Sequence, residues 1–281
     1  MKRGRNYSTL RRLGEGIAKH AYAFSWPGRL WAHIPGATTV TRIQHDLALG
    51  RGGRPPLRVA FASDLHIGPT TARETLDNAF DELRRIAPDV LVLGGDYVYL
   101  EATAARVAEL RDRVASVPAP TKLAVLGNHD LWTHHLRIED ALRAAGATVL
   151  INDAVRLPPP HDDIAFLGLD DPWTGDADGD RAVVAAGDAP IRLAVCHSPD
   201  GLPQVRGRGV SLMVCGHTHG GQIALPGHRP VVVPGIHGKE WPFGFHPLDD
   251  GLHLFVSRGV GTVEVPFRTF APPDVALFTI T

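Results

Sequence analysis

The sequence is poor in cysteine, with Cys196 and Cys215 the two that occur among 281 residues. Each stands at the end of an apolar run and shortly before a histidine, and two thiols are too few for a disulfide framework. We therefore expect both to be buried, reduced and packed as small apolar side chains. The scarcity also argues against a structural zinc site, which clustered cysteines usually build.

Long apolar runs are also missing. No stretch approaches the roughly 18 residues that a membrane-spanning helix needs. The first residues lack the apolar segment of a secretory signal. The sequence thus predicts a cytoplasmic protein, either free in solution or attached peripherally to the inner face of the membrane.

Basic residues are concentrated in the N-terminal segment. Residues 1–56 hold ten Lys and Arg against Glu15 and Asp46, a balance of +8, which leaves −9 for residues 57–281. An acidic body without basic runs does not suit a groove that follows the phosphates of a nucleic acid. We expect no nucleic-acid partner.

The basic segment carries an amphipathic helical pattern. Apolar residues recur in steps of three and four at Leu10, Leu13, Ile17, Ala21 and Phe24. Two interpretations stay open, a helix lying on an anionic membrane surface or a terminal helix packed on its own domain. Residues 50–56 have the composition of a linker. We therefore divide the chain into an N-terminal extension, residues 1–56, and a catalytic domain, residues 57–281.

From residue 57 onward, strand and helix patterns alternate. Apolar runs predict strands at 57–63, 90–93, 123–126, 148–151, 164–167, 191–195, 210–214, 252–256 and 275–280. Periodic apolar residues predict helices at 76–86, 104–114 and 138–145. This order predicts an α/β domain with buried sheets.

Five short polar motifs follow the predicted strands. They are Asp64-Leu65-His66, Gly95-Asp96, Gly127-Asn128-His129-Asp130, Cys196-His197-Ser198-Pro199 and Gly216-His217-Thr218-His219. In α/β architectures ligands bind at the carboxyl ends of strands, so five strand ends could meet at one point. Mixed carboxylate, imidazole and amide ligands suit Mn, Fe, Zn or Co better than calcium. Alone, most of these motifs would be ordinary turns, but together they predict a two-metal site that hydrolyses phosphate esters.

The order of these motifs resembles the calcineurin-like metallophosphoesterases, and the likeness extends over most of residues 57–281. Further segments are similar to the bacterial YkuE/YaeI branch, namely residues 214–222, residues 257–261, and Pro266-Phe267-Arg268 with Pro272-Pro273. That branch contains phosphodiesterases and is related to enzymes that split UDP-2,3-diacylglucosamine. The resemblance implies a sandwich of two mixed β-sheets flanked by helices, here with an N-terminal helical extension.

The resemblance also implies a role for each motif residue. It assigns Asp64, His66 and His219 to one ion and Asn128, His197 and His217 to the other, with Asp96 as the bridge and manganese favoured. His129 then stays unligated and stabilises the transition state or protonates the leaving oxygen, with Asp130 orienting it. A metal-bridging hydroxide is the expected nucleophile. The branch often has an acidic residue where this chain has Tyr99.

Outside the metal set, Arg258 is the chief candidate for binding the substrate phosphate, because a guanidinium recognises phosphate oxygens bidentately. Gln222 and Arg268 are further candidates. The predicted function is hydrolysis of phosphodiester or pyrophosphate bonds in a small-molecule phosphoester. The amphipathic N-terminus makes a nucleotide-sugar lipid, split by a UDP-2,3-diacylglucosamine pyrophosphatase-like reaction at the membrane surface, the main alternative. A non-catalytic scaffold of the same fold ranks lower.

Overall fold

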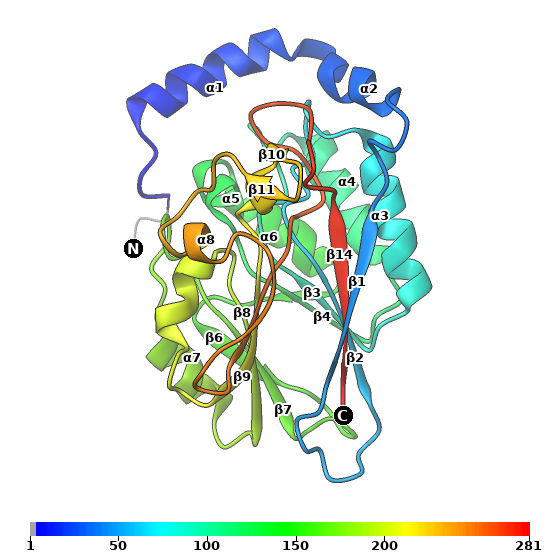
Figure 1. Cartoon of the computed structure of the whole chain (residues 1–281). Coiled ribbons are helices and arrows are strands. Elements are labelled where there is room, and N and C mark those ends of the chain that lie inside the picture. The colour runs from blue at the N-terminus through cyan, green and yellow to red at the C-terminus, as the bar shows by residue number, and fades with distance from the viewer. Residues whose placement is uncertain (1–3) are drawn as a thin grey trace.

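Two β-sheets form the centre of the protein in the computed structural model, which describes residues 4–281 (Figure 1). In spatial order, the first sheet contains β1 (Thr41–Leu47), β14 (Asp274–Ile280), β2 (Leu57–Ala62), β3 (Val90–Leu93), β4 (Thr121–Ala124) and β5 (Ala147–Val149). The second contains β12 (Gly244–Pro247), β13 (His253–Val256), β9 (Val210–Cys215), β8 (Ile191–Val195), β7 (Ile164–Gly168) and β6 (Asp153–Arg156). Strands β2 to β5 are parallel, as are β13, β9, β8 and β7. The antiparallel pairs β14 with β2, β12 with β13 and β6 with β7 make both sheets mixed.

Side chains of each strand alternate between two cores. In β2, Leu57, Val59 and Phe61 pack between the sheets, whereas Ala60 and Ala62 face the helices. The outer face of the first sheet is covered by α3 (Arg73–Ile86), α4 (Ala104–Ala115) and α6 (His135–Ala144). The outer face of the second is covered by α7 (Gly179–Ala186). The predicted sandwich of two mixed sheets flanked by helices is confirmed.

Short elements connect these layers. They are the α-helices α5 (Asn128–Trp132) and α8 (His237–Glu240), the 3₁₀ helices Ala23–Ser25, Pro199–Gln204 and His219–Gly221, and the hairpin of β10 (Ala224–Leu225) with β11 (Arg229–Pro230). Cys196 and Cys215 are buried and free, as expected.

The N-terminal segment has two parts. Helices α1 (Thr9–Ala21) and α2 (Trp26–Ala32) lie across the top of the sandwich in Figure 1. Strand β1, which the sequence did not indicate, pairs in parallel with β14 along its whole length. Arg51, within the stretch of linker composition, is buried. Residues 41–51 are therefore packed on the sandwich, and the division of the chain at residue 56 stays a prediction.

Within residues 4–281, no helix combines the length and the apolar character needed to cross a bilayer.

Candidate metal centre

The loops after five parallel strands bring the predicted ligands together. Asp64 follows β2, Asp96 follows β3, Asn128 follows β4, His197 follows β8 and His217 follows β9. All seven predicted ligands are buried. Two groups, Asp64 with His66 and His219, and Asp96 with His197 and His217, each bring their ligand atoms within 4.8 Å of one another.

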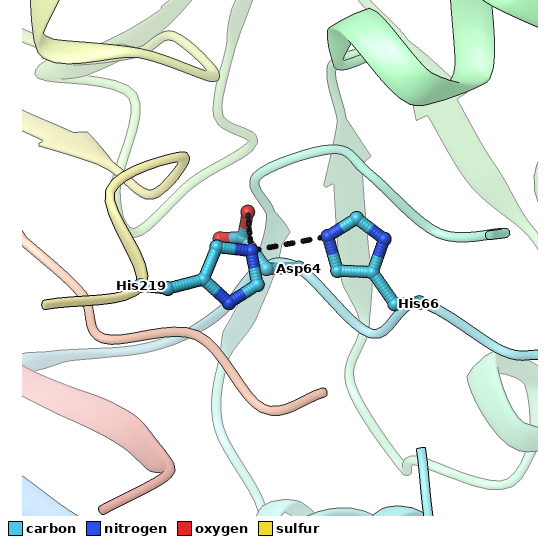
Figure 2. Close-up of side chains that lie close together, drawn as sticks. All are labelled: Asp64, His66 and His219. Carbon is cyan, nitrogen blue, oxygen red and sulfur yellow. Dashed lines mark hydrogen bonds and ion pairs between the residues drawn. The ribbon is translucent and has the colours of Figure 1, made fainter. Parts of the chain in front are cut away.

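The first group offers one carboxylate and two imidazole rings to a common point (Figure 2). His219 Nε2 lies 3.1 Å from His66 Nε2 and 3.4 Å from Asp64 Oδ1. Arg268 Nη2 lies 3.0 Å from His219 Nδ1, so Nδ1 accepts and the neutral ring carries its proton on Nε2, facing His66. For Nε2 to bind a divalent ion, the neutral ring would have to carry its proton on Nδ1 instead, because imidazole binds metal through its unprotonated nitrogen.

The second group is oriented by the backbone. His197 Nδ1 lies 2.8 Å from the Gly94 carbonyl, which can only accept, so this hydrogen bond leaves His197 Nε2 to serve as a ligand. That Nε2 lies 3.2 Å from Asn128 Oδ1, 3.2 Å from His217 Nδ1 and 3.2 Å from Asp96 Oδ2. The donor set of nitrogen and oxygen atoms fits a transition-metal dication.

Asp96 lies between the two groups. Its Oδ1 accepts a hydrogen bond from the backbone N–H of His129 at 2.8 Å. Its Oδ2 lies 3.2 Å from His197 Nε2 and 3.6 Å from His66 Nε2. One oxygen therefore faces both groups, as a bridging ligand must.

Positive charge is what this buried site requires. Burial disfavours the ionised Asp96 carboxylate, yet the surrounding His197, His129 and His66 hold its pKa well below the ordinary value. Burial raises the pKa of Asp64 to about 6, against the opposing effect of His197. Two buried carboxylates are stabilised by cations beside them, and metal ions held by these residues would supply that charge.

The backbone at this site is unusual. Five of the seven predicted ligands have left-handed conformations, with φ of 54° at Asp64, 42° at His66, 56° at Asp96, 71° at His217 and 53° at His219. Only a few per cent of non-glycine residues adopt such angles, and their clustering is typical of functional sites. Two motif glycines allow close approach, because a Cβ on Gly216 would lie 2.1 Å from Asp64 Oδ2 and one on Gly127 would lie 2.2 Å from Asp96 Oδ1.

His129 is buried beside the two groups. Its Nε2 lies 3.1 Å from Nη2 of Arg11, a residue of helix α1. Burial lowers the pKa of His129 well below its usual value, although Asp96 opposes this effect. The ring is therefore neutral near pH 7, and its Nε2 accepts the hydrogen bond from Arg11.

Within residues 4–281 the side chain of Asp130 makes its hydrogen bonds to the backbone and not to His129, and the orienting role predicted from the sequence stays a prediction. Asp130 Oδ2 accepts hydrogen bonds from the backbone N–H groups of Asp96, at 2.8 Å, and Gly127, at 3.0 Å. Its Oδ1 accepts from the N–H of Tyr97 at 2.9 Å. Neighbouring residues of a helix point in different directions, so Asp130 turns toward the Asp96 loop while His129 turns toward the cavity.

A cavity of about 310 Å³ opens over the ligands. Its polar lining includes Asp96, Asn128, His129, His217 and His219. Its apolar lining includes Trp173, Ile223, Val232, Pro234, Val263 and Val265. Arg11 and Glu264 also line it. A charged group can thus reach the ligands while an apolar group contacts the walls.

The arginines predicted to contact substrate lie elsewhere. Arg258 Nη1 pairs with Asp274 Oδ2 at 3.4 Å, and its guanidinium lies 4.4 Å from the centre of the Phe243 ring. Arg258 is not among the residues that line the cavity. Arg268 is buried behind His219, where it also donates to the carbonyls of Gly261 and Ala271. The structure does not place Arg258 among the residues that line the cavity, where a phosphate ligand would have to lie.

Gln222 lines the cavity, but its amide group is engaged with the chain. Its Nε2 donates to the carbonyls of Val263 and Val265 at 3.0 Å each, and its Oε1 accepts from the Val263 N–H at 2.9 Å. Gln222 therefore shapes the wall of the cavity.

Arg11 lines the cavity although the sequence motifs did not indicate it. In the sequence it is one of several basic residues between the apolar positions of the N-terminal helix. Arg11 and Glu15 stand four residues apart, the spacing that lets two side chains pair on one face of a helix. This spacing could have indicated an ion pair between them. Glu15 is the one acidic residue of α1 and is buried.

Two mixed sheets whose strand ends carry adjoining groups of carboxylate and imidazole ligands define a two-metal hydrolase. The model of the calcineurin-like phosphoesterase family matches residues 57–221. The chain belongs to this family, and it is a metal-dependent phosphoester hydrolase with a two-metal site.

Curated relatives agree with this assignment. The chain is 31% identical to phosphodiesterase YaeI of Escherichia coli, over 85% of this chain and 87% of that protein. It is 28% identical to the uncharacterized metallophosphoesterase YkuE of Bacillus subtilis, over 79% and 78% of the two chains. It is 26% identical to the UDP-2,3-diacylglucosamine pyrophosphatase LpxG of Chlamydia trachomatis, over 88% and 91%.

Proposed function

We propose that this protein hydrolyses phosphodiester or pyrophosphate bonds of a small-molecule substrate. The observation that carries the proposal is the position of Asp96 Oδ2, which faces both ligand groups. Asp64, His66 and His219 would hold one ion, and Asn128, His197 and His217 the other. The mixed nitrogen and oxygen donors suit Mn, Fe, Zn or Co, of which we favour manganese.

When bound, two such ions neutralise phosphate oxygens and activate a water at neutral pH. The chain itself holds the substrate and excludes water. The apolar walls of the cavity shield the reacting phosphate, which strengthens every electrostatic contact to it. His129 lines the same cavity, where the tautomer with its proton on Nε2 would donate a hydrogen bond to a phosphoryl oxygen or to the leaving oxygen.

Replacing Asn128 tests the proposal. The Asn128→Ala variant should lose about 100-fold or more of Mn²⁺-dependent hydrolysis of bis-p-nitrophenyl phosphate, because one ion loses its amide ligand. The metal content should fall below that of the wild type. Asn78→Ala is the matched control, since Asn78 is exposed on α3. Unchanged turnover in Asn128→Ala would refute this assignment, and fewer than one ion per wild-type chain after reconstitution would favour a scaffold.

A lipid substrate at a membrane surface is a second candidate, supported by the orientation of α1. Leu10, Leu13 and Ile17 are 80%, 63% and 63% exposed, whereas Glu15 is buried. The helix therefore turns its polar side to the domain and its apolar side outward. Of the described residues of α1 and α2, the exposed charged ones are Arg12, Lys19 and Arg29, all basic. This combination is typical of helices that bind anionic bilayers.

The cavity supports the same candidate. Its apolar walls suit an acyl chain, and Val232 is exposed at the surface as well as lining the cavity. The likeness to LpxG makes a nucleotide-sugar lipid with a pyrophosphate bond the natural substrate to compare with soluble diesters. Binding of the protein to anionic vesicles is the direct measurement of membrane attachment.

A further inference from the structure

Helix α1 brings Arg11 into the cavity. The Arg11 side chain is 24% exposed, and it lines the cavity together with Asp96, Asn128 and His129. Among the described residues that line this cavity, Arg11 alone is a lysine or arginine. A negatively charged phosphoester in the cavity would therefore meet one guanidinium, supplied from outside the sandwich.

The contacts of Arg11 hold it in place and leave donors available. Its Nε donates to Glu15 Oε1 at 3.1 Å, and its Nη2 lies 3.0 Å from Glu264 Oε1 and 3.1 Å from His129 Nε2. The Cζ atom lies 4.0 Å from the centre of the Trp132 ring. Nη1 makes no hydrogen bond to any part of residues 4–281. Both N–H groups of Nη1 are thus free to bind another acceptor.

We infer that Arg11 is a substrate-binding residue, which donates hydrogen bonds to the non-bridging oxygens of the substrate phosphate. The inference rests on the proposed phosphoester hydrolysis in the same cavity. A planar guanidinium with free N–H groups matches phosphate geometry, and stacking on Trp132 fixes the plane in advance. When Nη2 turns from His129 to the phosphate, the hydrogen bond that Arg11 donates to His129 Nε2 is released.

Attachment of α1 to the domain does not by itself explain the position of Arg11. Lys19 Nζ pairs with Glu101 Oε1 at 2.8 Å, and Tyr22 Oη donates to the Glu264 carbonyl at 2.7 Å. These contacts already tie the second half of α1 and the residue after it to the domain. The two roles are therefore separable by substitution, because Lys19 anchors the same helix without lining the cavity.

The test compares Arg11→Ala and Arg11→Lys with the wild type in the full chain, with Mn²⁺ and bis-p-nitrophenyl phosphate. We expect kcat/KM to fall about 10- to 100-fold in Arg11→Ala, mainly through KM, because a charge-assisted hydrogen bond to substrate is lost. The inhibition constant of inorganic phosphate should rise by a similar factor. The kcat/KM of Arg11→Lys should lie between the values for Arg11→Ala and the wild type, since lysine keeps the positive charge but not the planar arrangement of N–H donors. Metal content should stay at the wild-type value, whereas the melting temperature of Arg11→Ala should fall, because the buried Glu15 loses its ion-pair partner.

The matched controls are Arg12→Ala, the exposed neighbour, and Lys19→Ala, the anchor of the same helix. Both should keep the wild-type KM and phosphate inhibition. Equal losses in Lys19→Ala and Arg11→Ala would assign the effect to helix docking and overturn the inference. Wild-type KM and phosphate inhibition in Arg11→Ala, with Asn128→Ala inactive, would overturn this inference alone. Full activity of Asn128→Ala would instead count against the metal centre.

Discussion

Asp130 holds together two of the loops that carry metal ligands. Its carboxylate accepts backbone N–H groups from the loop after β3 and from Gly127, just before α5. The loop after β3 contains Asp96, whose left-handed backbone needs support from its surroundings. We therefore propose that Asp130 positions Asp96, the predicted bridging carboxylate.

The Asp130→Asn variant should lose both stability and metal. An amide cannot accept from N–H groups on both of its ends, so at least one buried donor loses its partner, at a cost of about 1 to 3 kcal/mol. We expect a lower melting temperature, weaker Mn²⁺ binding and about 10- to 100-fold less activity. Thermal unfolding with and without Mn²⁺ measures this, with the exposed Asp140→Asn as control. Loss of activity with wild-type stability and metal binding would instead favour the role predicted from the sequence.

Residue types and their order indicated which side chains would meet at one point, but not every contact that they make. Asp64, Asp96, Asn128 and the four histidines of the predicted set, which follow β2, β8 and β9, meet as the motifs predicted, because each motif follows a buried strand. Arg258 and Asp130 make contacts that the motifs did not indicate, because their partners are set by packing. Arg258 lies beside Asp274, and Asp130 faces a loop more than thirty residues away in sequence.

The two faces of helix α1 carry side chains of different kinds. Its inward side carries Arg11 and Glu15, and its outward side carries Leu13 and Ile17. An amphipathic pattern in a sequence usually indicates an apolar face turned toward a core. Here that face is turned to the outside, which the periodicity alone could not reveal.

The paired substitution Leu13→Ser and Ile17→Ser should abolish attachment to vesicles that contain phosphatidylglycerol. Burying each apolar side chain contributes about 1.5 to 3 kcal/mol, so losing both should weaken binding about 100-fold or more. Hydrolysis of soluble diesters should stay unchanged. Co-sedimentation at low and high salt measures the binding.

The control for this experiment is Leu136→Ser with Val184→Ser, because those two exposed apolar residues lie on α6 and α7 instead. The control should bind vesicles as the wild type does. Equal binding by the α1 variant and the wild type would contradict the membrane proposal.

The predicted strands and helices agree with the observed ones to within a few residues, because buried apolar runs and periodic faces are local signals. Strand β1 escaped prediction for a physical reason. It lies at the edge of the sheet with several exposed polar side chains, so its sequence has no continuous apolar run. Its pairing with β14 joins opposite ends of the chain.

A buried ion pair joins the two sheets. Arg51, from the connection between β1 and β2, makes a bidentate contact with Asp163, just before β7, through bonds of 2.9 Å from Nε to Oδ2 and 2.9 Å from Nη2 to Oδ1. Both side chains are nearly inaccessible to solvent. The contact explains why a stretch of linker composition is fixed on the domain.

Asp163→Asn should destabilise the protein by about 3 kcal/mol, because it leaves a buried guanidinium without its counter-charge. Hydrogen bonding to Arg51 lowers the pKa of Asp163 in the folded state. The stabilisation is therefore present above the unfolded pKa of about 3.9 and is lost as the pH falls through the lower folded pKa. The difference in melting temperature between the wild type and Asp163→Asn should have its full size near about pH 7 and shrink below about pH 4.

Scanning calorimetry across this pH range measures the effect. The adjacent Asp162→Asn is the control, because Asp162 pairs with Arg54 in an exposed position where such pairs contribute little. A difference between the wild type and Asp163→Asn that does not depend on pH would contradict the electrostatic explanation.

The sequence by itself determined the chemistry of this protein. Polar motifs after buried strands fixed the ligand types, their order and the family, because apolar runs and the residues that end them are local. The tertiary structure alone decided which side of α1 faces the domain, that Arg11 reaches His129 across 118 residues, and that Arg258 is withdrawn from the cavity. These outcomes depend on how distant segments pack, and no local period in the chain records that packing.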